Sequence, residues 1–521
     1  MKVVCIFVHF CRIANRSNTC HLNTPERILN MKTGFDNQKY LKLQSEKIRE
    51  RIASFDNKLY LEFGGKLFDD YHASRVLPGF EPSSKLQMLL QLSDQAEVII
   101  VINARDIEKN KVRADLGITY DRDVLRLINV YRSKGLYVGG VVLTCYEEHA
   151  SVQAFRTKLE SQGIAVYRHY RIEGYPKNIP LIISENGYGK NDYIETTRPL
   201  VIVTAPGPGS GKMATCLSQL YHENKRGVRA GYAKFETFPI WNLPLEHPVN
   251  LAYEAATADL NDVNMIDSFH LSAYGVSTVN YNRDIEIFPV LNEMFRRIFG
   301  ESPYKSPTDM GVNMAGFCIF DDEACREASR QEIIRRYYEA LIRRADLLAS
   351  EDELFKIEFL MQQLGLTVNA RTCTAVANET SKKLGVTCAA LELADGSVVT
   401  GKTSDLLGPC SAVLLNALKN LTGIDHETPL ISPHALEPIQ TLKTNYFGSK
   451  NPRLHTDETL IALSVSASDN ATAKQALDAI PQLRGCQLHC SARLSKVDLD
   501  TLRRLGLQVT MDPLREHAPL D

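Results

Sequence analysis

The sequence predicts an α/β protein, with parallel strand–helix–strand units in an N-terminal region and a smaller C-terminal α/β domain. Three observations lead to this fold class. Short β-branched runs alternate with segments whose apolar residues recur at helical spacing, the pattern of parallel βαβ units. A P-loop-like glycine loop connects a buried apolar run to a helix within residues 199–222. An Asp395-Gly396 pair between alternating apolar residues indicates a hairpin in the C-terminal part.

Length and composition restrict the class of protein. The chain has 521 residues, more than one ordinary domain, and its net charge of −2 gives no general attraction for nucleic acid or anionic membrane. No apolar run approaches the length of a membrane span. The 12 cysteines are scattered, which is typical of reduced thiols. We expect a cytoplasmic protein without nucleic-acid or membrane partners, and formation of a homo-oligomer stays open.

Residues 1–30 differ in character from the rest of the chain. Lys2 and the apolar run after it imitate a signal peptide, but Arg12 and Arg16 follow at once and no small-residue cleavage pattern is evident. Met31 begins a stretch that resembles a natural start. We interpret residues 1–30 as a non-native or disordered extension, in preference to a targeting segment, and expect that they add nothing to the fold.

The N-terminal region, residues 31–365, is predicted to alternate between strands and helices, and a split into two subdomains near residue 195 stays open. Its strands are apolar runs that end in polar residues, where open parallel sheets bind ligands. The strands are expected at 59–63, 97–103, 138–144, 165–170, 200–203 and 230–235. The helices are expected at 40–55, 83–92, 120–133, 149–162, from 213 onward, 287–299, 322–348 and 351–363.

Polar clusters follow two of these strands. Gly64-Gly65-Lys66 and then Asp69, Asp70, Tyr71, His72 and Arg75 come after the first strand, and Lys234–Pro239 ends a later one. Such clusters are typical of the mouth of an α/β site. The first cluster is equally consistent with a solvated turn.

The glycine loop is the most informative motif. It combines backbone N–H groups at a helix start with one lysine charge, which suits a phosphate. The signature G-x-x-x-x-G-K-[ST] would require Gly at 206 and Ser or Thr at 213, but the chain has Pro206 and Met213. Thr215 is the candidate for the missing magnesium-binding hydroxyl. A structural turn and another anionic ligand remain alternatives. The candidate binding residues are Gly207, Gly209, Ser210, Gly211, Lys212 and Thr215.

A second polar stretch, residues 247–284, supplies the candidate catalytic carboxylates. Val263–Asp267 resembles a strand that ends in aspartate, the position of a magnesium-binding carboxylate beside a phosphate loop. Glu254 is the other candidate, although Tyr253–Leu260 also fits an amphipathic helix with its acids in water. The sequence assigns no protein ligand set for a resident metal.

The C-terminal domain, residues 366–521, is predicted to open with a helix and a hairpin. Its outline resembles the zinc deaminases, but no His-x-Glu occurs and Val413 stands where the second cysteine after Cys410 is required. Cys410 and the group Cys486, His489 and Cys490 are interpreted as structural. Helices are expected at 374–384, 409–421, 471–480 and 496–504, and strands at 389–393, 398–401, 460–467, 485–491 and 507–511.

Four stretches carry a family resemblance: Leu61–Lys66, Thr204–Lys212, His247–Leu260 and Gly396–Leu415. They are similar to a large bacterial family known only as a domain of unknown function, and the resemblance covers nearly everything from Met31 onward. It implies an N-terminal region with the glycine loop and a separate smaller C-terminal domain, but no activity. Some members carry an automatic label as ATP-dependent zinc proteases.

The sequence does not support that label, because it contains no His-Glu-x-x-His. His222-Glu223 has Arg226 in the place of the second histidine. The leading hypothesis is that residues 207–212 bind a nucleotide or phosphorylated metabolite, in a phosphoryl-transfer or hydrolytic enzyme. ATP or another nucleotide with Mg²⁺ is the candidate cofactor. A non-catalytic regulatory protein that binds a phosphometabolite is the alternative, and a metalloprotease comes third.

Overall fold

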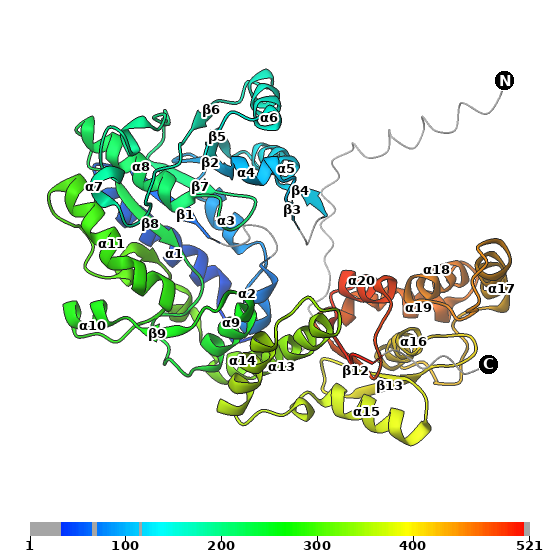
Figure 1. The fold of residues 1–521 in the computed structure, drawn as a ribbon. Coiled ribbons are helices and arrows are strands. Elements are labelled where there is room, and N and C mark those ends of the chain that lie inside the picture. The colour runs from blue at the N-terminus through cyan, green and yellow to red at the C-terminus, as the bar shows by residue number, and fades with distance from the viewer. Residues whose placement is uncertain (1–32, 65–69, 114–116, 515–521) are drawn as a thin grey trace, which may run out of the picture.

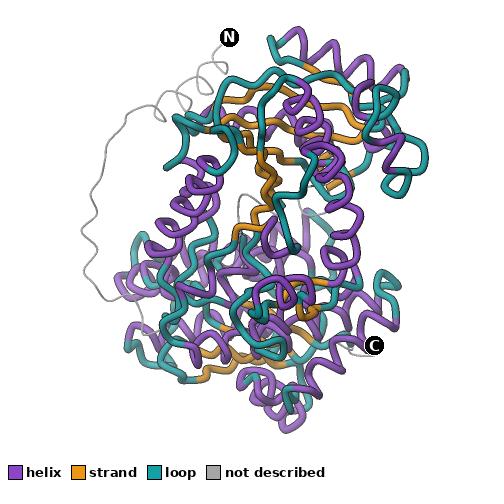
Figure 2. Tube along the Cα trace, turned by 90° about the vertical axis from the view of Figure 1, so that its left-hand side faces the viewer, coloured by secondary structure: helices purple, strands orange, loops and turns teal. Residues whose placement is uncertain are grey.

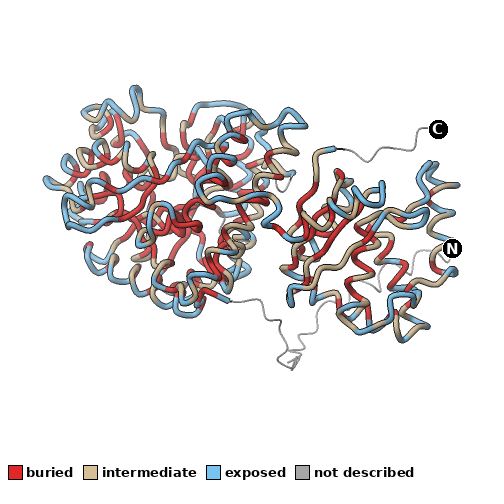
Figure 3. Tube along the Cα trace, turned by 90° about the horizontal axis from the view of Figure 1, so that it is seen from below, coloured by how far each residue is buried: buried red, intermediate tan, exposed pale blue. Residues whose placement is uncertain are grey.

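The computed structural model describes residues 33–64, 70–113 and 117–514, which form two α/β domains (Figure 1). The extension at residues 1–30 lies outside these ranges, as do Gly65, Lys66 and Asp69 of the first polar cluster. Buried segments form one group in each domain (Figure 3), and they correspond to two separate hydrophobic cores. The predicted fold class is confirmed.

A seven-stranded sheet with parallel neighbours throughout is the centre of the N-terminal domain. Both β1 and β7 are buried at every position, as expected for strands covered on both faces. The spatial order is β11 (Gly311–Val312), β8 (Gly231–Phe235), β1 (Leu59–Phe63), β7 (Leu200–Thr204), β2 (Ala96–Asn103), β5 (Tyr137–Thr144) and β6 (Val166–Arg168). The central strand β7 therefore lies between β1 and β2, although it follows both in the chain.

Helices cover this sheet on either side (Figure 2). No helix in the described ranges is long and apolar enough to cross a bilayer. The helices of this domain up to residue 310 are α1 (Asn37–Ala53), α2 (Tyr71–Val76), α3 (Ser84–Leu90), α4 (Ala104–Glu108), α5 (Tyr120–Ser133), α6 (Ala150–Ser161), α7 (Ile179–Ile182), α8 (Lys212–Lys225), α9 (Pro248–Ala256), α10 (Ser268–Tyr274), α11 (Asn282–Phe299) and α12 (Pro307–Met310).

Two small antiparallel ribbons accompany the main sheet. β3 (Val112–Arg113) pairs with β4 (Ile118–Thr119), and β9 (Asn264–Ile266) pairs with β10 (Val279–Tyr281). The strand expected at 263–267 is thus present as β9, but it belongs to a ribbon and not to the parallel sheet. Met265 and Ile266 are exposed, so β9 lacks the burial on both faces that a central parallel strand requires.

Two helices lead from the first domain to the second. α13 (Asp322–Ala345) begins at its N-cap Asp321, and α14 (Glu351–Gln363) begins at its N-cap Ser350. Ile333 and Ile334 of α13 are buried in the N-terminal core, while Ile342 packs against the C-terminal core. The helix therefore joins the domains.

A four-stranded sheet forms the C-terminal domain, in the order β13-β12-β14-β15. The predicted hairpin is confirmed as β12 (Cys388–Glu392) and β13 (Val398–Lys402), which pair antiparallel. β14 (Gln487–Cys490) pairs antiparallel with β12 and parallel with β15 (Gln508–Met511). The helices are α15 (Thr372–Leu384), α16 (Pro409–Thr422), α17 (Pro433–Thr441), α18 (Thr456–Ser466), α19 (Ala471–Asp478) and α20 (Lys496–Arg504).

The strand predicted at 460–467 is wrong, because these residues belong to α18. The apolar run Leu460–Val465 is ambiguous by periodicity alone. The first turn favours a helix over a strand, because a capping box joins His455 and Glu458. The backbone N–H of His455 donates to the Glu458 carboxylate at 2.8 Å. Glu458 also pairs with Lys443 Nζ at 2.7 Å.

Candidate functional site

A large cavity lies between the two domains, beyond the carboxyl ends of β1 and β8. Its volume is about 1550 Å³, above the usual size of a small-molecule site. Both predicted polar clusters reach it: Asp70, Tyr71, His72 and Arg75 after β1, and residues 234–238 at the end of β8. The described residues that line the cavity include ten arginines and lysines against five aspartates and glutamates. Its electrostatic character therefore favours an anionic ligand.

Lys234 and Glu236 line the cavity and form a cluster with the carboxylate of Asp284 behind them. Lys234 Nζ lies 3.2 Å from Glu236 Oε1 and donates to Asp284 Oδ2 and to the Tyr281 hydroxyl. Glu236 Oε2 is buried, and the side chain of Asp284 interacts with the Glu236 carboxyl group. Burial raises the pKa of Glu236 to about 8; the charge of Asp284 adds to this shift and that of Lys234 opposes it. A carboxyl group whose pKa is raised in this way is suited to act as a general acid near neutral pH.

Lys234 remains charged within this cluster. Burial alone would lower its pKa, but the neighbouring acidic groups, Asp284 foremost, outweigh burial and raise that pKa. A neutral carboxylic acid beside a permanent cation is an arrangement suited to proton transfer near a developing negative charge.

A second ionic network stabilises the wall of the cavity that α13 forms. Glu332 accepts from Arg335 Nε at 2.6 Å and lies 2.9 Å from both Arg75 Nε and Arg336 Nε. Burial would raise the pKa of Glu332, but these guanidinium groups lower it well below its usual range. His72 faces the same carboxylate at 3.6 Å, and burial lowers the pKa of its imidazole. Because one carboxylate joins α2 to α13, we infer that this network is structural support for the cavity.

The glycine loop lies at the same edge of the sheet, one strand away from the cavity. β1 pairs with β7 in a register that puts Glu62 beside Val203, so Gly64, which lines the cavity, lies next to the start of the loop. Two glycines have positive φ, +75° at Gly209 and +92° at Gly211. A Cβ on Gly207 would lie 2.3 Å from the Tyr120 hydroxyl oxygen.

Free donors are present where the loop enters α8. The N-cap Gly211 makes no side-chain cap, and the N–H of Thr215 is the first that bonds back into the helix, to Gly211 O at 2.9 Å. The N–H groups of residues 212–214 and Lys212 Nζ have no hydrogen-bond partner in the described part of the chain. Ser210 Oγ instead donates to Gly207 O at 2.8 Å and closes the loop.

Three other candidate residues lie away from these donors. Thr215 is fully buried in α8, and its Oγ1 has no partner within the described residues. Asp267 is fully buried as the N-cap of α10, and it also accepts from the Thr308 hydroxyl at 2.7 Å. Glu254 Oε1 accepts from the N–H of Asn264 at 2.9 Å. Neither carboxylate is among the residues that line the cavity.

Several residues at the cavity have no local sequence signal. Glu236 and its neighbour Asp284 occur inside two of the predicted polar stretches, but nothing in the local sequence indicates that they meet at one lysine. Arg371 and Arg503 come from the C-terminal domain. Only the packing of the domains brings these arginines to the sheet edge, so no local sequence pattern could have indicated them.

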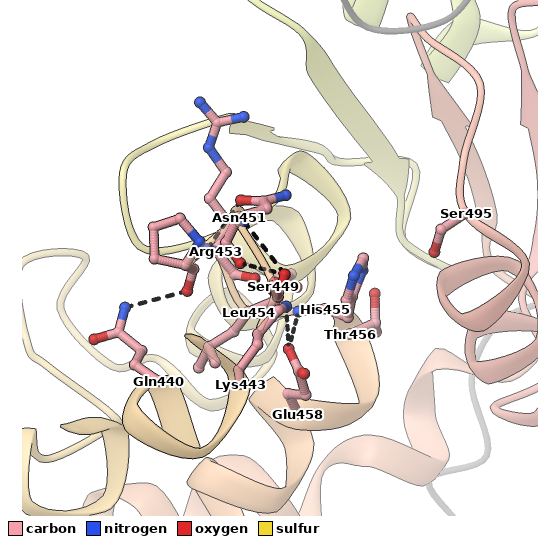
Figure 4. Close-up of polar contacts among 12 residues, drawn as sticks. Gln440, Lys443, Ser449, Asn451, Arg453, Leu454, His455, Thr456, Glu458 and Ser495 are labelled. Atoms are coloured by element: carbon pink, nitrogen blue, oxygen red, sulfur yellow. Dashed lines mark hydrogen bonds and ion pairs between the residues drawn. The ribbon is translucent and has the colours of Figure 1, made fainter. Parts of the chain in front are cut away.

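A smaller pocket of about 210 Å³ lies inside the C-terminal domain. Cys410 and Cys490 line it, and the contact with Cys490, together with burial, raises the pKa of the Cys410 thiol. His455 Nδ1 lies 2.9 Å from Asp498. Asn451, Arg453 and Leu454, on the loop that precedes His455, also line the pocket (Figure 4). In the described ranges, no three His, Cys, Asp or Glu side chains are grouped so that they could hold a metal ion.

Fold and cavity together define a class: two-domain α/β proteins with a glycine loop and a basic cleft at the carboxyl edge of a parallel sheet. Residues 33–365 match the family model "Domain of unknown function DUF1846, N-terminal", and residues 369–520 match its C-terminal counterpart. The chain belongs to this uncharacterised family.

Curated relatives extend over almost the whole chain. A UPF0371 protein of Corynebacterium diphtheriae is 58% identical over 92% of this chain and 97% of its own length. A UPF0371 protein of Streptococcus uberis is 55% identical over 94% of this chain and 99% of its own length. The family resemblance stated from the sequence is confirmed, and these names carry no activity.

Proposed function

We propose that the protein is an enzyme that binds a phosphorylated small metabolite at the Gly207–Lys212 loop and transfers or hydrolyses its phosphoryl group in the adjoining cleft. One observation carries the proposal: the free donors of the loop and the buried carboxyl group of Glu236 belong to the same edge of one parallel sheet. Ligands bind at that edge in open α/β sheets.

The distance between the two features suits a small metabolite. The loop follows β7 and Glu236 follows β8, with β1 between them. Two strand spacings amount to about 10 Å. A metabolite anchored by one phosphate at the start of α8 can therefore present a second phosphoryl group to Glu236, so that the leaving oxygen of that second group lies beside the carboxyl.

The groups at the two ends divide the chemistry between them. Lys212 and the N–H groups of residues 212–214 would stabilise negative charge on the phosphoryl oxygens. Glu236 would donate its proton to the leaving oxygen as the bond from phosphorus to that oxygen breaks, and Lys234 would remain charged beside it. Phosphorus receives its new bond from water or from a second substrate oxygen.

The residues at the loop fit a phosphate better than a magnesium-bound nucleotide. Met213 occupies the position of the magnesium-binding hydroxyl, Thr215 is buried, and Asp267 caps α10 at another sheet. We therefore assign no role in the reaction to Mg²⁺, Asp267 or Glu254.

Binding is tested by thermal shift with ATP, GTP, sugar phosphates and orthophosphate. The wild type should gain thermal stability with at least one phosphate compound, and Lys212→Ala should weaken that ligand's binding by roughly ten- to a hundredfold, the loss of one charge-assisted hydrogen bond. Lys158→Ala is the matched control, because Lys158 is an exposed helical lysine in α6. Unchanged melting of the wild type with every compound would remove the phosphate proposal.

Turnover is tested separately, by release of orthophosphate from compounds that bind. Glu236→Gln should retain binding and lose release by about a hundredfold or more, since a general acid contributes on the order of 10²–10⁴. Binding without release in the wild type would favour the alternative, a non-catalytic regulatory protein.

A further inference from the structure

The wall that the C-terminal domain contributes to the cleft carries a buried guanidinium that forms no ion pair with a carboxylate of the described ranges, although its charge acts on the pKa of Glu392. Arg371 is 1% exposed. Its Nη1 donates to Gln487 Oε1 at 2.6 Å, its Nη2 to Gln508 O at 2.6 Å and its Nε to Thr510 Oγ1 at 3.2 Å. All three acceptors are neutral. A charge removed from water is costly unless an opposite charge compensates it.

The opposite wall differs in this respect. Lys85 lies 2.7 Å from Asp70, Arg75 is bound to Glu332, and Lys234 is bound to Asp284. Each of these cations of the N-terminal wall thus has a carboxylate partner within the protein. The arginines that form no such ion pair with a described residue belong to the C-terminal wall.

Three further arginines surround Arg371 at the rim of the same cavity: Arg484, Arg503 and Arg504. Their side chains are exposed and make no hydrogen bond or ion pair with any residue of the described ranges. Two of them end α20, which lies on the side of the C-terminal domain that faces the N-terminal domain (Figure 1). Like charges gathered in one concave place repel one another unless an anion enters.

We infer that Arg371, Arg484, Arg503 and Arg504 form a polyanion-binding wall, and that the cleft takes a small ligand with at least two neighbouring anionic groups, of the oligophosphate class. Arg371 uses three of its five N–H donors internally, so two remain for a bidentate contact. These four arginines line one cavity, and the chain as a whole has a net charge of −2. This arrangement favours a compact anion over a nucleic-acid strand. The inference goes beyond the proposed function, because it concerns a different wall and does not depend on the glycine loop.

The test is calorimetric titration of the full chain with inorganic tripolyphosphate, pyrophosphate and orthophosphate. Affinity should rise with the number of phosphate groups, and Arg503→Ala/Arg504→Ala should weaken tripolyphosphate binding at least about tenfold. Both side chains are exposed, so this variant should fold. Arg132→Ala/Lys134→Ala is the control, because it removes two exposed cations at the end of α5 and should bind like the wild type.

Three results would overturn the inference: no saturable binding of tripolyphosphate to the wild type, equal losses in the two double variants, or tighter binding of a single-stranded oligonucleotide. Adding Arg503→Ala/Arg504→Ala to Lys212→Ala separates this inference from the proposed function. A further loss on that background supports the wall even if the loop binds nothing, and no further loss counts against it.

Discussion

Among single residues, Glu236 has the most unusual environment. Its carboxyl group is buried beside Lys234 and Asp284, and its pKa is raised to about 8 from an ordinary 4.5. Folding therefore takes up a proton at pH values between about 4.5 and 8, since the unfolded chain has already lost it. The free energy of unfolding must fall as pH rises through this range, and the contribution becomes constant above it.

Glu236→Gln should remove this pH dependence. At pH 5 the variant and the wild type should have similar free energies of unfolding, and by pH 8.5 the variant should be more stable by on the order of 4 kcal/mol. Denaturant titrations at several pH values measure the difference. Glu246→Gln, at an exposed glutamate nearby, is the control and should follow the wild type. Parallel pH profiles of wild type and Glu236→Gln would show that Glu236 is ionised in the fold.

At the scale of elements, the sequence was informative wherever burial and periodicity agreed. The helix expected at 351–363 is α14 with the same bounds, and the strand expected at 97–103 is β2. The sequence-based prediction failed at α18, because a short apolar run is compatible with either a strand or a helix. The capping contact between His455 and Glu458 favours the helix. For the candidate site, polar residues after β1 and β8 indicated the cavity. The meeting of Glu236 with Asp284, and the arginines of the second domain, depend on tertiary packing that no local pattern encodes.

Glu458→Ala should destabilise α18 specifically. The substitution removes the acceptor of the His455 N–H and the partner of Lys443, at a cost of about 1–2 kcal/mol for a lost cap with a partly buried ion pair. Thermal unfolding measures the loss. Glu437→Ala, at an exposed glutamate of α17, should change stability by less than about 0.5 kcal/mol. Equal losses of thermal stability in the two variants would mean that the cap does not stabilise α18.

At the scale of the whole molecule, the described residues form two large hydrophobic cores, one in each domain, joined by α13. The surface between them is lined mainly by charged and polar side chains and encloses a cavity. Domains joined through such a surface are expected to move relative to each other and to unfold separately. A ligand that contacts both walls would couple them.

Leu463→Ala should lower one unfolding transition and leave the other unchanged. Leu463 is fully buried in the C-terminal core, and its truncation should cost about 2–5 kcal/mol. Differential scanning calorimetry measures the two transitions. Leu291→Ala, in the N-terminal core, should have the converse effect. A single transition that shifts equally in both variants would show that the domains unfold as one unit.

The position of β7 has a consequence for folding during synthesis on the ribosome. β1 and β2 leave the exit tunnel early, but they are not neighbours: the place between them belongs to β7, which is synthesised long after β2. Until then the nascent sheet has two unpaired inner edges, each able to pair with a wrong strand. The glycine loop follows β7 directly, so the same late insertion that closes the sheet also creates the ligand loop. Any fragment that stops before residue 200 lacks both the central strand and the ligand loop. We expect the nascent chain to bind chaperones most during this interval.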